Sequence, residues 1–285
     1  MDYELMMNGT VKIGQHAPSF EAETTYGPVS LEDYKGKWLV FFSHPGDFTP
    51  VCTTEMIAFA NACPYFEKLN TCLLGLSIDS NPSHLAWMRD IYCMTGIVLP
   101  FPIVADRNGS IARKYGMISN DISSTETVRN VFVIDDKGIV RVILVYPLNI
   151  GRFIPEILRI IQALQMADCS KGSTPANWMP GQPVIETPPK TYPQLQERLN
   201  FIEQNNNGMS WYLSFKEPPK LCDKWQFGVN LVSVFFLTAL SRKTPVPNYQ
   251  KTSTQLSCNR WQCSLAFNFF VGFFRAFFTL FLNFK

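Results

Sequence analysis

One short stretch of the sequence, residues 44–55, places reactive side chains at a spacing that suggests chemistry. Cys52 falls in the first turn of an expected helix, where free backbone N–H groups and the positive end of the helix dipole favour thiolate over thiol. Thr49 would place a hydroxyl beside this sulfur, and Pro45 and Pro50 would keep the loop rigid and shield the thiolate from water. Cys52 is therefore a candidate nucleophile, and the alternative is a buried structural cysteine at a helix start.

Apolar patterns on both sides of this stretch predict the elements that position it. An apolar run at 38–43 fits a strand buried on both faces, and residues 53–69 carry an apolar stripe at helical spacing, with Pro64 expected to kink it. A second buried strand at 72–78 and a helix at 81–95 complete a βαβ unit. The elements expected after them are strands at 101–104, 129–134 and 139–145, with a hairpin turn at 135–138, and a helix at 151–167. This order predicts a thioredoxin-like α/β fold, although order alone leaves other α/β arrangements open.

Composition narrows the class of protein. The 285 residues are 46% hydrophobic and 17% charged, with a net charge of +2, which is typical of a globular chain and argues against nucleic acid as a partner. Eight cysteines are too few for a disulfide scaffold in a chain of this length, and residues 1–22 carry no secretion signal. We therefore expect a reducing compartment, the cytoplasm.

The pattern Pro-x-x-x-Thr-x-x-Cys at residues 45–52 resembles the signature of the peroxiredoxin family. The resemblance covers roughly residues 14–219, and its other matching blocks are 74–80, 84–87, 100–103, 114–117 and 175–178. Their spacing is most similar to that of the one-Cys branch and its microbial relatives. The resemblance implies a thioredoxin-like peroxidase domain at 10–168 followed by a C-terminal dimerisation segment at 169–219.

The resemblance also implies a role for each matching residue around the cysteine. Cys52 would be the peroxidatic cysteine, whose thiolate attacks a hydroperoxide and becomes a sulfenic acid. Thr49 would hydrogen-bond the peroxide, and Pro45 would cap the pocket. Arg129 matches the family arginine that favours the thiolate and polarises the peroxide oxygen, and the alternative for it is a surface arginine at a strand edge.

Three further residues are expected to support this site. Glu55 would orient Arg129, and Arg152 matches a second arginine near the site in the family. His44 lies directly before Pro45, where this branch carries a histidine close to the thiol, and it would tune the pocket. The alternative for His44 is a hydrogen-bonded structural role.

The remaining histidines and cysteines do not suggest a bound metal. His16 and His84 are expected to be structural, and the three histidines of the sequence are too scattered along the chain for a metal site. Cys258 and Cys263 have no matching ligand pair at zinc spacing. We expect no metal and no bound cofactor.

The fate of the sulfenic acid depends on whether a second cysteine lies within disulfide reach. Thr174 takes the place of the resolving cysteine that two-Cys relatives carry before Pro-Ala, and Ser214 takes the place of the cysteine that some microbial one-Cys relatives carry after Trp-Tyr-Leu. Cys222 is the candidate resolving residue that follows, although the sequence around it no longer matches the family. We expect one-Cys turnover with an external thiol of the thioredoxin, glutaredoxin or glutathione type.

The resulting prediction is a thiol-dependent peroxidase that reduces hydrogen peroxide and small alkyl hydroperoxides, as a homodimer or a ring of dimers. The alternative from another functional class is a peroxide-responsive redox sensor or a chaperone-like holdase that uses the same cysteine. Residues 220–285 do not resemble the family and are rich in phenylalanine. They are expected to be either translated sequence beyond a frameshift or misassigned exon, which we favour, or a membrane anchor.

Overall fold

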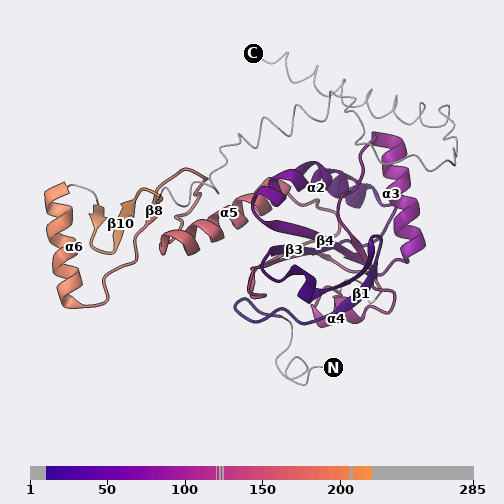
Figure 1. The fold of residues 1–285 in the computed structure, drawn as a ribbon, viewed down its shortest axis with the longest axis horizontal. Helices are drawn as coiled ribbons and strands as arrows, with labels where there is room; N and C mark the ends of the chain where they lie inside the picture. Colours follow the sequence, from indigo (N-terminus) through magenta and orange to yellow (C-terminus); the bar gives the residue numbers. More distant parts are fainter. Residues whose placement is uncertain (1–10, 120, 122, 124, 206–207, 220–285) are drawn as a thin grey trace, which may run out of the picture.

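The structure, a computed structural model, describes residues 11–119, 121, 123, 125–205 and 208–219. The tail at 220–285, with Cys222, lies outside the described residues. The described part forms a seven-stranded sheet flanked by helices and, beyond it, a small unit with a three-stranded sheet (Figure 1). None of the helices within the described part combines the length and the apolar character needed to cross a membrane.

The seven-stranded sheet has the strand order β2-β1-β5-β4-β3-β6-β7. Its strands are β1 (Glu21–Thr24), β2 (Gly27–Ser30), β3 (Trp38–Ser43), β4 (Thr71–Ser77), β5 (Ile103–Ala105), β6 (Arg129–Ile134) and β7 (Val140–Tyr146). β3, β4 and β5 run parallel, whereas β6 is antiparallel to β3 and forms a hairpin with β7. Each strand expected from an apolar run is present, so the predicted α/β sheet is confirmed.

Helices cover both faces of this sheet (Figure 1). They are η1 (Leu31–Tyr34), α2 (Pro50–Lys68), α3 (Asn81–Thr95), α4 (Ser110–Lys114) and α5 (Ile154–Ser170). Val40 and Phe42 of β3 pack into the core formed with α2, α3 and α5, while Leu39 and Phe41 point to the opposite face and pack in the core that includes α4. The alternation follows from the pleat of a strand, and it explains why the run in β3 is apolar throughout.

α2 carries Cys52 and begins earlier than the apolar stripe predicts. Its first residue is Pro50, three before the expected start at Thr53, and Thr49 precedes it in an extended conformation. Proline is tolerated in the first turn of a helix, because the N–H it lacks would have no partner there. Pro64 lies inside α2, which continues to Lys68. Cys52 is consequently the third residue of the helix, among its free N–H groups.

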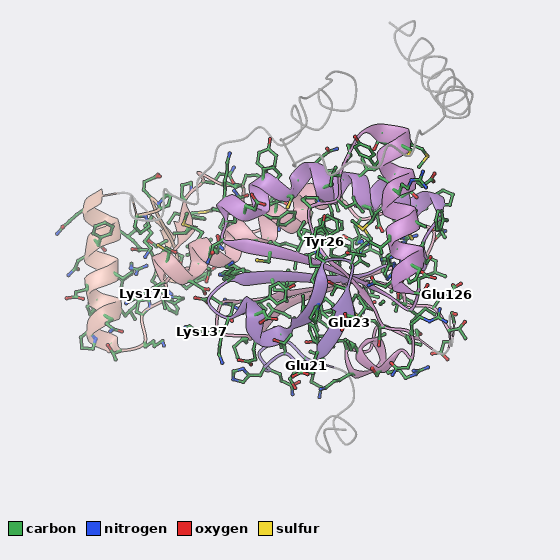
Figure 2. The ribbon with its side chains drawn as sticks, turned by 45° about the vertical axis from the view of Figure 1, so that its right-hand side comes forward. Glu21, Glu23, Tyr26, Glu126, Lys137 and Lys171 are labelled. Carbon is green, nitrogen blue, oxygen red and sulfur yellow. The ribbon has the colours of Figure 1, made fainter. Side chains whose placement is uncertain are left out.

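The C-terminal segment folds into a separate small unit beyond α5 (Figure 1). Its elements are β8 (Val184–Ile185), α6 (Tyr192–Asn205), β9 (Gly208–Ser210) and β10 (Leu213–Lys216), with the strand order β8-β10-β9. The chain leaves α5 at Lys171, whose backbone is left-handed with φ of 49° (Figure 2). Trp178 and Val184 pack against Met166 of α5 and so attach the start of this segment to the helix.

Candidate active site

Cys52 lies at the beginning of α2 with its side chain completely buried in the core. The helix places the sulfur at the positive end of the helix dipole, as the sequence predicts. Arg129, the first residue of β6, approaches it from the sheet, and its Nη1 lies 3.3 Å from Cys52 Sγ. β3 and β6 are neighbours in the sheet, and this pairing brings the two distant parts of the chain together. A guanidinium at this distance stabilises a thiolate.

The Arg129 side chain is held in place by several acceptors. Its Nη1 donates to Glu55 Oε2 at 2.7 Å, and its Nε and Nη2 donate to the carbonyl oxygen of Leu148 at 3.0 and 2.8 Å. Only 2% of Arg129 is exposed, so the alternative of a surface arginine at a strand edge is excluded. The guanidinium therefore has one fixed orientation, with Nη1 toward the sulfur.

Glu55 is a buried carboxylate shared by two arginines. Besides Arg129, it binds Arg152, whose backbone N and Nε donate to Oε1 at 2.8 Å each and whose Nη2 donates to Oε2 at 2.6 Å. Burial acts to raise the pKa of Glu55, but the charges and hydrogen bonds of Arg152 and Arg129 hold that pKa below its ordinary value. Glu55 is therefore ionised at neutral pH and holds both guanidinium groups, of which that of Arg129 contacts the cysteine.

Pro45 and Thr49 lie on the loop between β3 and α2, which also contains Phe48. Thr49 Oγ1 donates to the carbonyl oxygen of Gly46 at 3.0 Å, which leaves its oxygen lone pairs for a further donor. Phe48 has a left-handed backbone, with φ of 55°, and the residue is 55% exposed. Such a conformation is strained for a side chain of this size and persists only when the surroundings enforce it.

His44 contacts an aspartate of the same loop. It is completely buried, and its Nε2 lies 3.0 Å from Oδ1 of Asp47. Asp47 also contacts Nδ1 of His84 on α3, at 2.9 Å from its Oδ2. The two histidines are thus brought together around one carboxylate, a contact that their separation along the chain did not indicate.

Two of the other described cysteines, Cys63 and Cys72, are poor nucleophiles. Burial and the neighbouring Glu67 raise the pKa of Cys63 to about 12, and burial raises the pKa of Cys72 as well. A thiol whose pKa is raised holds little thiolate at neutral pH. Cys222, the candidate resolving residue, lies outside the described residues.

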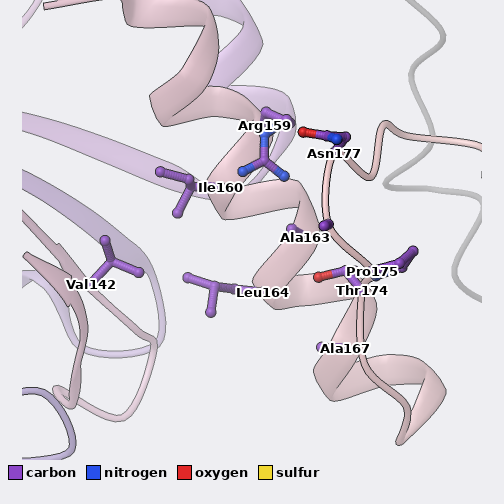
Figure 3. Close-up of a pocket in the computed structure, with 10 residues that line it drawn as sticks. Val142, Arg159, Ile160, Ala163, Leu164, Ala167, Thr174, Pro175 and Asn177 are labelled. Atoms are coloured by element: carbon purple, nitrogen blue, oxygen red, sulfur yellow. The ribbon is translucent and has the colours of Figure 1, made fainter. Parts of the chain in front are cut away.

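A cavity of about 350 Å³ lies away from this site, between α5 and the start of the C-terminal segment (Figure 3). Val142 of β7, Arg159 of α5 and Thr174 are among the residues that line it. None of the residues expected for catalysis lines this cavity, so it gives no argument about the peroxide site.

Comparison with known proteins places the chain in a family. Residues 13–143 match the AhpC/TSA family, and residues 163–200 match the C-terminal domain of 1-Cys peroxiredoxin. The chain is 57% identical to Peroxiredoxin 2 of Caldanaerobacter subterraneus subsp. tengcongensis over 206 residues, which cover 72% of this chain and 93% of that protein. It is 48% identical to a peroxiredoxin of Aquifex aeolicus over 217 residues, covering 72% of this chain and 96% of the relative.

Solved structures give the same result. A cysteine-to-serine mutant of peroxiredoxin 6 from Arenicola marina matches with a TM-score of 0.65 at 33% identity, covering 74% of this chain and 99% of that one. A yeast mitochondrial 1-Cys peroxiredoxin matches with a TM-score of 0.64 at 39% identity, covering 73% of this chain and all of that one. The sheet, the matched domains and the relatives agree, and the chain belongs to the peroxiredoxin family of thiol-dependent peroxidases.

Proposed function

We propose that Cys52 is the peroxidatic cysteine and that Arg129, Thr49 and Pro45 form the peroxide site with it. The observation that carries this proposal is the 3.3 Å contact between Arg129 Nη1 and Cys52 Sγ at the first turn of α2. A helix N-terminus and a fixed guanidinium both stabilise negative charge on sulfur, and thiolate is the form that attacks peroxides.

The reaction forms one bond and breaks one. The Cys52 thiolate attacks the terminal oxygen of the hydroperoxide, a sulfur–oxygen bond forms, and the oxygen–oxygen bond breaks with its electron pair passing to the leaving oxygen. Sulfur is oxidised to sulfenic acid, and the leaving oxygen takes a proton to become water or an alcohol. Arg129 stabilises the charge that moves from sulfur to oxygen, and Thr49 binds the peroxide. Pro45 shields the pocket from water.

Three other residues support these groups without contacting the reacting atoms. Glu55 and Arg152 fix the guanidinium of Arg129 through the shared carboxylate. His44 acts through Asp47, which it contacts. These assignments predict that changes at Glu55 or Arg152 lower the reaction rate by displacing Arg129.

An external thiol is proposed as the reductant. It attacks the sulfenic sulfur with release of water, and a second thiol then reduces the mixed disulfide and regenerates Cys52. Ser214 and Thr174 stand where relatives carry resolving cysteines, and Ser214 is buried and bonded to Glu186. The solved yeast relative is described through a thiol resolving mechanism via glutathione/thioredoxin systems, which favours the same reductant class here. Cys222 is the alternative resolving residue.

A homodimer, or a ring of dimers, is the proposed assembly, and the cytoplasm is the proposed compartment. The C-terminal unit exposes large apolar side chains that a second copy of the chain would cover, namely Tyr192, Met209, Trp211 and Tyr212. We propose the same division of the chain as the sequence predicts. It has a peroxidase domain at 10–168, a dimerisation segment at 169–219 and a tail at 220–285.

Mass spectrometry of the full chain after one equivalent of hydrogen peroxide, with a sulfenic-acid trap present, tests this proposal. Trapping at Cys52 in the wild type, and its loss in Cys52→Ser, is the expected result. Cys63→Ser is the matched control, because Cys63 is buried further along the same helix and has Glu67 rather than an arginine as its neighbour, and it should leave trapping unchanged. A disulfide between Cys52 and Cys222 would replace the external-thiol step, and an unmodified Cys52 would overturn the proposed site.

A further inference from the structure

The loop that precedes Cys52 is fastened by a buried group of three residues. The Asp47 side chain is 2% exposed and lies between two histidine side chains with no exposed surface. His84 Nδ1 is 2.9 Å from Asp47 Oδ2, and His84 Nε2 is 3.3 Å from the carbonyl oxygen of Val104 in β5. His44 Nε2 is 3.0 Å from Asp47 Oδ1.

Counting donors and acceptors fixes the number of protons in this group. A carbonyl oxygen only accepts hydrogen bonds, and so does an ionised carboxylate. Burial acts to raise the pKa of Asp47, but hydrogen bonds from His44 and His84 hold it well below its usual range, so Asp47 is ionised. Both ring nitrogens of His84 therefore face acceptors. A neutral imidazole has a single N–H and would leave one of these buried contacts without a hydrogen.

His44 does not need a second proton. Its Nε2 faces Asp47, while its Nδ1 has no hydrogen-bond partner among the described residues. Burial lowers the pKa of His44, against the effect of Asp47, and the charges of His84 and Arg152 lower it further. A neutral His44 with its hydrogen on Nε2 fits these contacts. His84 is thus the histidine of the group whose two ring nitrogens both face acceptors.

The charged and titratable groups around His84 come from several parts of the chain. Asp47 faces it from the loop after β3, and His44 faces it from the end of that strand, with the two rings 6.0 Å apart. Asp79, in the turn before α3, accepts a hydrogen bond from the backbone N of Asp47 at 2.9 Å. Arg152, whose guanidinium lies over Phe42, is the cation whose charge acts on His44. Asp47 is the group that balances a charge on His84 directly.

This group connects the loop to the helix and the sheet behind it. Asp47 lies between Pro45 and Thr49, the two loop residues proposed to shape the peroxide pocket. His84 belongs to α3, and its contact with Val104 reaches β5. Displacing Asp47 would therefore move Pro45 and Thr49 relative to Cys52. Because the reaction depends on the orientation of these groups, such a displacement would lower its rate.

We propose that His84 is a positioning residue that acts as a buried imidazolium, donating from both ring nitrogens to Asp47 and Val104 and thereby fixing the peroxide-binding loop. The proposal rests on the proposed roles of Pro45 and Thr49, and it assigns to His84 a function that its sequence context did not indicate. The distances of 3.0 and 2.9 Å from His84 Nδ1 to the two oxygens of Asp47 are those of hydrogen bonds, so an N–H on Nδ1 is directed at the carboxylate.

The variant Asp47→Asn distinguishes the proposed positioning role of His84 from an ion pair that only stabilises the fold. The asparagine oxygen would accept from His44, and its amide N–H would donate to Nδ1 of His84, so a neutral His84 would satisfy every contact. The proposal therefore expects His84 to lose one proton in this variant while the loop stays attached. An ion pair that merely stabilises the fold would instead leave a buried cation without its counterion.

The first test is ¹⁵N NMR of the histidine side chains in the reduced full-length protein at neutral pH. Two protonated nitrogens are expected for His84 in the wild type, and hydrogen on Nε2 alone is expected in Asp47→Asn. A neutral His84 in the wild type would overturn the proposal. This measurement does not depend on peroxidase activity, so its failure is distinguishable from failure of the proposed site, which the sulfenic-acid trap reports.

The second test is the rate constant for the reaction of the reduced protein with hydrogen peroxide. His84→Ala is expected to lower it by about tenfold, and Asp47→Asn by about threefold or less, because only the first removes the contact with α3. His16→Ala, a change at an exposed histidine, is the control and should not alter the rate. Wild-type activity in His84→Ala, or an equal loss in both variants, would overturn the positioning role. If His84→Ala does not fold, His84→Asn, which keeps one donor for Asp47, replaces it and is expected to fall between the other two.

Discussion

At the scale of single residues, the site depends on the two arginines that share Glu55. Arg129 uses its planar fork fully, with Nη1 between the sulfur and Glu55 and with Nε and Nη2 on Leu148. A lysine has no such fork and cannot reach all three partners at once. The preference for arginine over lysine at this position therefore comes from geometry as much as from charge.

Arg129→Lys is therefore expected to lower the rate constant with hydrogen peroxide by about 100-fold, the loss that follows removal of a fixed donor to a developing charge. Stopped-flow measurements at neutral pH check this loss. Arg141→Lys, a change at a partly exposed arginine paired with Asp168, is the control and should leave the rate constant unchanged.

Glu55 connects the site to the stability of the fold. Because its folded-state pKa lies below the ordinary value of 4.5, the unfolded chain takes up a proton at Glu55 before the folded chain does. The stabilisation is complete above pH 4.5 and is lost as pH falls through the lower folded-state value. Glu55→Gln should lose about 3 kcal/mol of unfolding free energy at neutral pH, because two buried arginines lose their counterion.

Denaturant unfolding of both proteins between neutral and acidic pH measures this. The difference between wild type and Glu55→Gln should shrink as the pH falls below 4.5, since glutamine cannot be protonated in that range. A difference that stays constant with pH would contradict the assigned ionisation.

At the scale of elements, apolar runs were sufficient to predict the strands that hold the site. β3, β4 and β6 are buried throughout or nearly so, and apolar residues make up most of their sequences. β1 and β2 gave no such signal because they form a hairpin at the edge of the sheet, with polar and partly exposed residues. α4 spans only 5 residues, too few for a helical period to repeat.

The candidate site residues could be named from the sequence only where the chain carries motifs that resemble those of the family. Cys52 and Arg129 were candidates named from the resemblance to the family, and the pairing of β3 with β6 brings these two residues into contact. The contact between Asp47 and His84 was not predicted, because 37 residues separate them and only the packing of α3 against β5 brings them together. No local pattern encodes a distance of that kind.

The end of α5 offers a test of backbone conformation. Lys171 caps the helix in the left-handed region, which costs a residue with a Cβ atom more than it costs glycine. Lys171→Gly is expected to raise the unfolding free energy by about 0.5–1 kcal/mol. Lys137→Gly, at a turn position outside the left-handed region, should give no gain. Equal effects at both positions in denaturant titrations would contradict the role of backbone strain.

At the scale of the whole molecule, the C-terminal unit exposes several large apolar side chains. Met209 is 79% exposed, Tyr192 73% and Tyr212 56%, all within a small unit that has little core of its own. Large apolar patches on a protein surface mark interaction sites. The proposed dimer would bury this surface, and a second copy of the chain is a partner that is always present at matching concentration.

Met209→Asp combined with Tyr212→Asp is therefore expected to shift the full-length protein from dimer toward monomer, because two charges would have to be desolvated in the interface. Light scattering coupled to size-exclusion chromatography over a range of concentrations measures the shift. Val98→Asp places a charge at a site that is 61% exposed outside this unit, and it should leave the assembly unchanged. A double variant that elutes with the mass of the wild type would show that these side chains serve another surface, while a fall in mass with unaltered Cys52 trapping would separate assembly from peroxide chemistry.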